Sequence, residues 1–101
     1  MRFALCNEVV RDLEFSAQAR LAAALGYDGL EVAPFTLDAE APHRLTASRR
    51  AELRRMAEDA GVPITGLHWL LVAPAGLSIV SADPAVRART IAVMERIASY
   101  V

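Results

Sequence analysis

Three short apolar runs without helical periodicity divide the chain. They cover residues 2–7, 29–34 and 64–72. Runs of this length are typical of strands that are covered on both faces. The second run stops at Pro34, which has no backbone N–H to donate to a neighbouring strand. The pattern therefore predicts three buried strands.

Helical periodicity fills the segments between these runs. Apolar residues recur at spacings of three and four over residues 13–25, 47–60 and 84–100, so we expect three amphipathic helices there. The expected N-caps, whose short polar side chains accept hydrogen bonds from the first turn, are Asp12, Thr46 or Ser48, and Asp83. The expected left-handed residues after the first two helices are Gly26 and Gly61.

The strict alternation of strand and helix decides the fold class. Such alternation implies right-handed crossovers and a parallel sheet, so we expect an α/β fold. The strands recur about thirty residues apart, close to the repeat of an eight-unit barrel of roughly 250 residues. We therefore expect residues 1–101 to form a single segment with the first three units of a TIM-type (β/α)8 barrel, incomplete in this chain.

A small doubly wound nucleotide-binding domain is the alternative α/β arrangement. Such domains usually bind phosphate through a glycine-rich turn after the first strand. Here that turn reads Cys6-Asn-Glu-Val-Val-Arg11 and contains no glycine. The sequence therefore disfavours nucleotide binding.

The composition indicates a folded protein with apolar surface to spare. Hydrophobic residues make up 54 % of the sequence and charged residues 23 %, which excludes a disordered chain. A domain of about 100 residues buries only roughly 60–70 % of its unfolded surface. We therefore expect some apolar faces and sheet edges to meet neighbours, including a partner in a homo-oligomer.

Charge and cysteine content narrow the partners and the compartment. The net charge of −1 lacks the basic footprint of a nucleic-acid-binding protein, so no nucleic-acid partner is expected. No apolar stretch approaches the ~20 residues that span a bilayer, and the N-terminus lacks the pattern of a signal peptide. Cys6 is the only cysteine, which is typical of the reducing cytosol. We therefore expect a cytoplasmic protein without membrane contact.

In parallel barrels the active site lies at the carboxyl ends of the strands. The polar or aromatic residues that interrupt or follow the apolar runs there are Asn7, Glu8, Glu31, His68 and Trp69. Glu31 stands between Leu30 and Val32, so its carboxylate points to the opposite face and needs a partner if it is buried. It either binds a substrate hydroxyl or orients a neighbouring base, or it forms a structural ion pair.

The third apolar run carries the most suggestive residue. His68 is expected to bind substrate, bind metal or transfer protons, unless backbone groups satisfy it as a core histidine. Trp69 is either an apolar wall for a sugar ring or a packing residue. Cys6 has no basic neighbour and is expected to be a small buried hydrophobe. These residues alone predict neither a complete catalytic set nor a metal site.

Two segments resemble a known superfamily. Gly26-Tyr-Asp-Gly-Leu-Glu-Val32 resembles the second-strand signature of the xylose isomerase-like barrels, and Asp59-Ala-Gly-Val-Pro-Ile-Thr-Gly-Leu-His68 resembles their second helix and third strand. The superfamily contains sugar-phosphate isomerases and epimerases, with apurinic endonucleases as a distant branch. The resemblance covers essentially the whole chain and about the first three-eighths of a family member.

The resemblance implies an isomerase or epimerase that acts on a small sugar or sugar phosphate. Such enzymes abstract a proton next to a carbonyl through an enediolate, which is held by a divalent metal such as Mn, Mg, Co or Zn. The metal ligands and paired glutamate acid/bases come from later strands, so no catalytic or metal-binding residue is carried over, and residues 1–101 alone are not expected to turn over substrate. The expected substrate-binding residues are Asn7, Glu31, His68 and Trp69. Among them, Glu31 and His68 match pocket-lining positions of the family.

Two further functions remain as alternatives. The first alternative is a short binding or structural module that completes its sheet by oligomerising. In the endonuclease branch a histidine at the end of the third strand binds zinc, which keeps a metal role for His68 open. The strand-end loops lack the basic and aromatic residues that grip phosphates and bases, which disfavours that branch.

Overall fold

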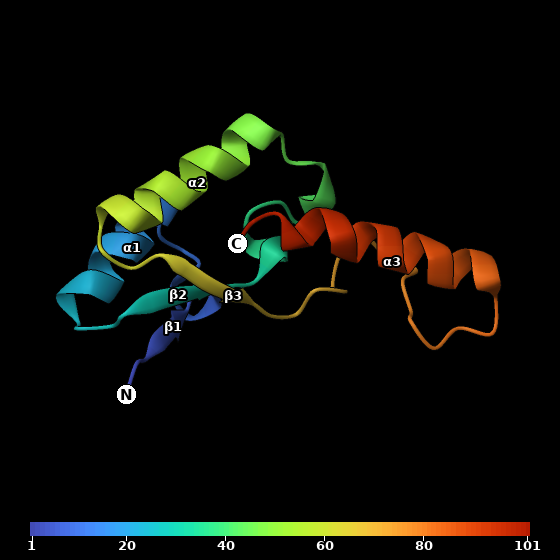
Figure 1. Cartoon of the computed structure of the whole chain (residues 1–101), viewed down its shortest axis with the longest axis horizontal. Coiled ribbons are helices and arrows are strands. Elements are labelled where there is room, and N and C mark those ends of the chain that lie inside the picture. Colours follow the sequence, from blue (N-terminus) through green and yellow to red (C-terminus); the bar gives the residue numbers. More distant parts are fainter.

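Three parallel strands form the centre of the fold (Figure 1). A computed structural model describes residues 1–101 and contains the strands β1 (Ala4–Cys6), β2 (Gly29–Val32) and β3 (Ile64–Leu67). All pairings are parallel, and the spatial order is β1-β2-β3. The predicted α/β fold with a parallel sheet is therefore confirmed.

Three α-helices alternate with the strands. They are α1 (Phe15–Ala24), α2 (Ala47–Asp59) and α3 (Pro84–Ala98). Short 3-10 helices occupy the connections, namely η1 (Asn7–Val10), η2 (Pro34–Thr36) and η3 (Pro42–Arg44). The helices α1 and α2 contact each other on one face of the sheet, whereas the other face carries no helix (Figure 1). The sheet therefore has one packed face and one open face, so the expectation of strands covered on both faces is wrong for this chain.

The packed face of the sheet holds the core. Leu30 and Val32 of β2 belong to the buried cluster, and neither is exposed to solvent. The helix residues in the same cluster include Ala19, Ala22, Leu53 and Ala57. Burial of each large aliphatic side chain contributes about 1.5–3 kcal/mol to stability. Because side chains alternate along a strand, this packing leaves Glu31 on the open face.

The last helix does not cover the sheet. Figure 1 shows α3 extending beyond the carboxyl ends of the strands, where it contacts η3. Val93, Ile97 and Tyr100 bring this end of the chain into the core cluster. The Tyr100 hydroxyl donates a hydrogen bond to the carbonyl of Pro42. The helix is thus held to the loop region that follows β2.

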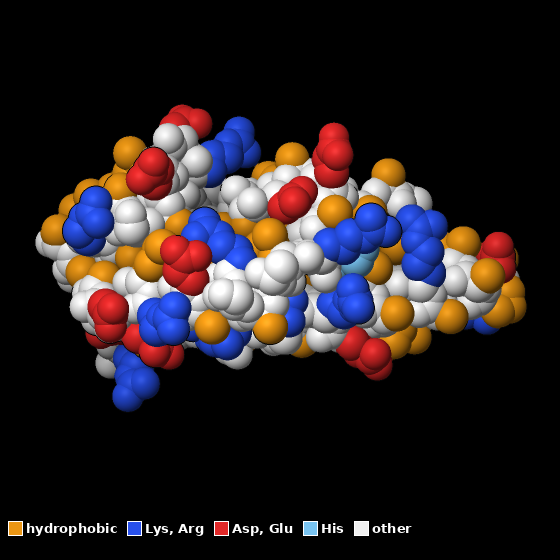
Figure 2. Space-filling model, turned by 90° about the horizontal axis from the view of Figure 1, so that it is seen from above, with side chains coloured by type: hydrophobic (Ala, Val, Ile, Leu, Met, Phe, Trp, Pro, Cys, Tyr) orange, Lys and Arg blue, Asp and Glu red, His pale blue; other side chains and the backbone are white.

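Charges of both signs are scattered over the surface of the molecule. Figure 2 shows acidic and basic side chains across the face that it presents, with hydrophobic side chains between them. The net charge of −1 therefore arises from interspersed charges of opposite sign. No helix combines the length and the apolar character that crossing a bilayer requires.

Local signals in the sequence set most element ends. Thr46 and Asp83 cap their helices, accepting hydrogen bonds of 3.0 and 2.9 Å from backbone N–H groups of the first turn. Gly26 and Gly61 follow α1 and α2 with φ angles of 86° and 85°, a region that favours glycine. These caps and left-handed residues are as predicted.

Two expectations about element ends are wrong. The helix α1 begins at Phe15, and Glu14 rather than Asp12 occupies its N-cap position, without a side-chain hydrogen bond. The strand β3 ends at Leu67 and does not continue to residue 72. Trp69 has a φ of 56°, a left-handed conformation that is incompatible with a continuing strand. The apolar run after β3 is therefore a loop, in which Leu70 packs against the core while Trp69 and Val72 are exposed.

Candidate functional site

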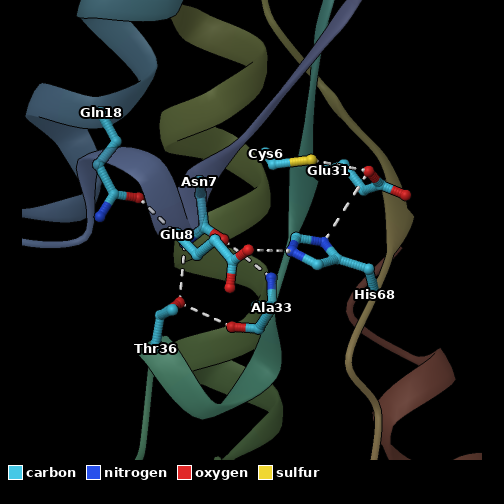
Figure 3. A network of polar contacts seen from close by, with 8 residues as sticks. All are labelled: Cys6, Asn7, Glu8, Gln18, Glu31, Ala33, Thr36 and His68. Atoms are coloured by element: carbon cyan, nitrogen blue, oxygen red, sulfur yellow. Dashed lines mark hydrogen bonds and ion pairs between the residues drawn. The ribbon is translucent and has the colours of Figure 1, made fainter.

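A histidine between two carboxylates lies at the carboxyl ends of the three strands (Figure 3). The Nε2 atom of His68 is 3.8 Å from Oε1 of Glu8, and its Nδ1 atom is 3.9 Å from Oε2 of Glu31. The exposed fractions of these side chains are 16 % for His68, 27 % for Glu8 and 39 % for Glu31. The group is therefore partly buried and still accessible to a small ligand.

The register of the sheet brings these residues together. Cys6 pairs with Glu31, and Glu31 pairs with Gly66, so consecutive strand ends lie at one edge. The His68 N–H donates a hydrogen bond of 3.1 Å to the carbonyl of Val32, which extends the pairing one residue past β3. The chain then turns at the next residue. His68 is thus held beside the open-face carboxylate.

The imidazole of His68 is incompletely satisfied. Both ring nitrogens are buried, and neither has a hydrogen-bond partner. A buried polar group without a partner costs roughly 1–3 kcal/mol. The two carboxylates flank the ring slightly beyond hydrogen-bond distance. The alternative interpretation, a core histidine satisfied by backbone groups, is therefore wrong, and the site favours a ligand that bridges these groups.

Cys6 belongs to the same group of side chains. Its thiol donates a hydrogen bond to Oε2 of Glu31 over 3.1 Å, and the residue is only partly buried. This hydrogen bond, followed by burial and by the negative charges of Glu31 and Glu8, raises the pKa of Cys6 to about 11. The thiol therefore keeps its proton at neutral pH and is not a nucleophile. The expectation of a simple buried hydrophobe is wrong, because the thiol has a polar partner.

Asn7 lies beneath the histidine group and supports it through hydrogen bonds. The side chain is fully buried. Its amide nitrogen donates to Oε1 of Gln18 at 3.2 Å and to Oγ1 of Thr36 at 2.8 Å, and its oxygen accepts from the Ala33 N–H at 2.8 Å. Figure 3 shows these contacts joining the end of β1 to η2 and α1. The geometry thus makes Asn7 a positioning residue rather than the substrate-binding residue that we expected.

Trp69 lies at an adjoining hollow and is 63 % exposed. The hollow has a volume of about 460 Å³ and is lined by Glu8, Val9, Arg11, Asp12, Phe35 and Trp69. Glu8 is common to this hollow and to the histidine group. A ligand held by His68 therefore has room to extend onto the indole, which keeps the expected sugar-facing role of Trp69 as a prediction.

The structure adds three residues to the expected set. Glu8 faces His68 directly, although the sequence marked it only as a polar residue after the first strand. Arg11 and Phe35 also line the hollow, so the expectation that the strand-end loops lack basic and aromatic residues is wrong. Neither residue carries a sequence signal that separates it from ordinary loop residues. Of the expected residues, Glu31 and His68 come together, whereas Asn7 lies beneath them.

Comparison with known proteins adds no relative. No protein-family model, no curated protein and no solved structure matches the chain. Functional inference for this protein therefore depends on the geometry of the strand ends.

Proposed function

We propose that the chain supplies the first three units of a TIM-type barrel in a metal-dependent sugar or sugar-phosphate isomerase or epimerase. The observation that carries the proposal is the position of His68 between Glu8 and Glu31 at consecutive strand ends. Parallel strands in sequential order and a helix-free open face are compatible with the start of such a barrel. The open face then corresponds to the barrel interior.

The three side chains suit a polyhydroxylated ligand. Sugar hydroxyls donate hydrogen bonds to the carboxylates of Glu8 and Glu31. The imidazole of His68 lies beside these carboxylates and can accept or donate a proton. Proton transfer at a carbon next to a carbonyl requires such a group. Arg11 lines the adjoining hollow and offers a cation for a phosphate group. In this scheme Trp69 packs against the sugar ring.

The divalent metal expected from the resemblance stays part of the proposal. When bound, such an ion stabilises the negative charge of an enediolate. In that family its ligands come from later strands, and residues 1–101 do not supply that set. The roles assigned to this chain are therefore limited to binding the sugar, orienting it and holding a proton on His68.

The test of this function is whether the parent protein that carries these residues exchanges a substrate hydrogen with solvent. We expect deuterium from D2O to appear at the carbon next to the carbonyl of one ketose, aldose or sugar phosphate, measured by NMR with Mn²⁺ or Co²⁺ present. Glu31→Gln and His68→Asn should each lower kcat/KM by about 100-fold or more, because each removes a group that holds substrate or a proton.

The matched control is Glu58→Gln, which changes an exposed carboxylate on α2. It should leave kcat/KM within about two-fold of the wild type. Absence of exchange with every sugar, or equal loss in Glu58→Gln and Glu31→Gln, contradicts the proposed function.

A second candidate, an oligomerising module, is favoured by the free edges of the sheet. β1 and β3 each pair on one side only, and the open face is uncovered. Unpaired edges recruit further strands when nothing blocks them. Light scattering distinguishes the two functions: a discrete symmetric assembly supports the module, and a monomer contradicts it.

A further inference from the structure

We propose that Cys6, Glu31 and His68 bind one zinc ion at the carboxyl end of the sheet. One ligand atom from each residue lies within 4.8 Å of the other two. Three consecutive strand ends supply the three residues, so the backbone already holds them together. The resemblance assigns no metal role to Cys6 or Glu31. The zinc site shares Glu31 and His68 with the proposed sugar site, and it is distinguished from that site by the participation of Cys6.

The distances between the ligand atoms are close to those of a zinc site. Tetrahedral zinc binds sulfur at about 2.3 Å and nitrogen or oxygen at about 2.0–2.2 Å, which places its ligand atoms roughly 3.5 Å apart. Here Sγ of Cys6 is 3.1 Å from Oε2 of Glu31, and that oxygen is 3.9 Å from Nδ1 of His68. Small side-chain rotations therefore suffice to surround an ion.

The donor types select zinc over harder cations. Thiolate and imidazole are ligands of zinc and similar transition metals, whereas Mg²⁺ and Ca²⁺ prefer oxygen ligands. Three protein ligands leave the fourth tetrahedral position for water or another molecule, as in catalytic zinc sites. The partial exposure of Glu31 gives access to that position. The expected ion is therefore zinc with one exchangeable ligand.

The surroundings of His68 support the assignment independently. Both ring nitrogens are buried without a hydrogen-bond partner. A metal at Nδ1 would use one of them and would leave Nε2–H facing the Glu8 carboxylate at 3.8 Å. Metal-binding histidines commonly donate their second N–H to a carboxylate, which fixes the orientation of the ring. Glu8 is thus the outer carboxylate of the site.

Metal binding exchanges a proton for the ion. In the metal-free protein the Cys6 thiol keeps its proton and donates a hydrogen bond to Glu31. Binding breaks this S–H bond, forms the metal–sulfur bond and releases the proton to solvent. No oxidant or reductant takes part. The same three side chains therefore hold either a proton or a metal ion.

Cobalt(II) reports on the site because its bond to a thiolate gives a charge-transfer absorption band. We expect the purified chain to bind one Co²⁺ with this band, and Zn²⁺ to displace it. Cys6→Ser should abolish the band. Glu31→Gln and His68→Asn should weaken binding at least about 10-fold, and Glu8→Gln about 10- to 100-fold. Glu58→Gln, on the surface of α2, should bind as the wild type does.

A second measurement needs no variant. Zn²⁺ should slow the reaction of Cys6 with a thiol-specific reagent in the wild-type chain, and Mg²⁺ should not. Equal reaction rates with and without Zn²⁺, or a Co²⁺ affinity unchanged in both Cys6→Ser and His68→Asn, would overturn the zinc site. Neither readout involves a sugar, so failure here leaves the isomerase proposal to its own test.

Discussion

Replacing Asn7 by alanine should lower the free energy of unfolding by about 3 kcal/mol. The side chain is fully buried and makes three hydrogen bonds. Its removal leaves the Ala33 N–H without its acceptor, while Thr36 and Gln18 each lose one of their bonds. Urea unfolding followed by circular dichroism measures the change.

Thr36→Val removes a smaller part of the same hydrogen-bond network and should therefore lower stability less than Asn7→Ala does. Thr36 accepts from Asn7 and donates to the Ala33 carbonyl over 2.7 Å, so its loss should cost about 1–2 kcal/mol. The surface change Glu58→Ala should cost less than about 0.5 kcal/mol. If Asn7→Ala also falls in that small range, the network does not stabilise the strand ends.

The Asn7 network also explains how stability and site are linked. Asn7 joins the end of β1 to the segment after β2, and Glu8 follows Asn7 directly in the chain. The position of the Glu8 carboxylate beside His68 therefore depends on a buried amide. A change at Asn7 should disturb the site even though the Asn7 side chain is fully buried beneath it.

The sequence predicted the fold where local chemistry decides the outcome. The alternation of periodicities gave the order of strands and helices, and Thr46, Asp83, Gly26 and Gly61 marked real helix ends. It failed at the end of β3, because an apolar run does not by itself specify the backbone conformation, and Trp69 and Val72 of this run are exposed. Trp69 belongs to such a run and still adopts a left-handed turn.

The candidate site was less predictable because it depends on contacts between strands. Glu31 and His68 were recognised from polar residues within apolar runs. Cys6 looked like a hydrophobe, since only the sheet register places its thiol beside Glu31. Asn7 was expected to bind substrate, since no sequence pattern reveals that three protein groups already form hydrogen bonds with its amide.

The second large effect on stability is expected where Tyr100 attaches α3 to the core. Tyr100→Ala should lower the free energy of unfolding by about 3–5 kcal/mol, because this buried ring is lost from the core. Denaturant unfolding measures the total, and amide hydrogen exchange shows whether α3 loses its protection first. Ile91→Ala, at a half-exposed position of α3, is the matched control and should cost less than about 1 kcal/mol. Equal costs for the two variants would contradict the anchoring role of Tyr100.

Tyr100→Phe distinguishes the contribution of the Tyr100 hydroxyl to stability from that of the ring. It keeps the packing and leaves the Pro42 carbonyl without its donor, so it should cost about 1 kcal/mol. Burial raises the pKa of Tyr100 from 10.0 to about 12. The unfolded chain therefore loses this proton at a lower pH than the folded chain, and wild-type stability should fall as pH rises from about 10 to about 12. The stability difference between the wild type and Tyr100→Phe should shrink over that interval. A difference that stays constant with pH would mean that the hydroxyl is not buried, and that α3 is held by apolar packing alone.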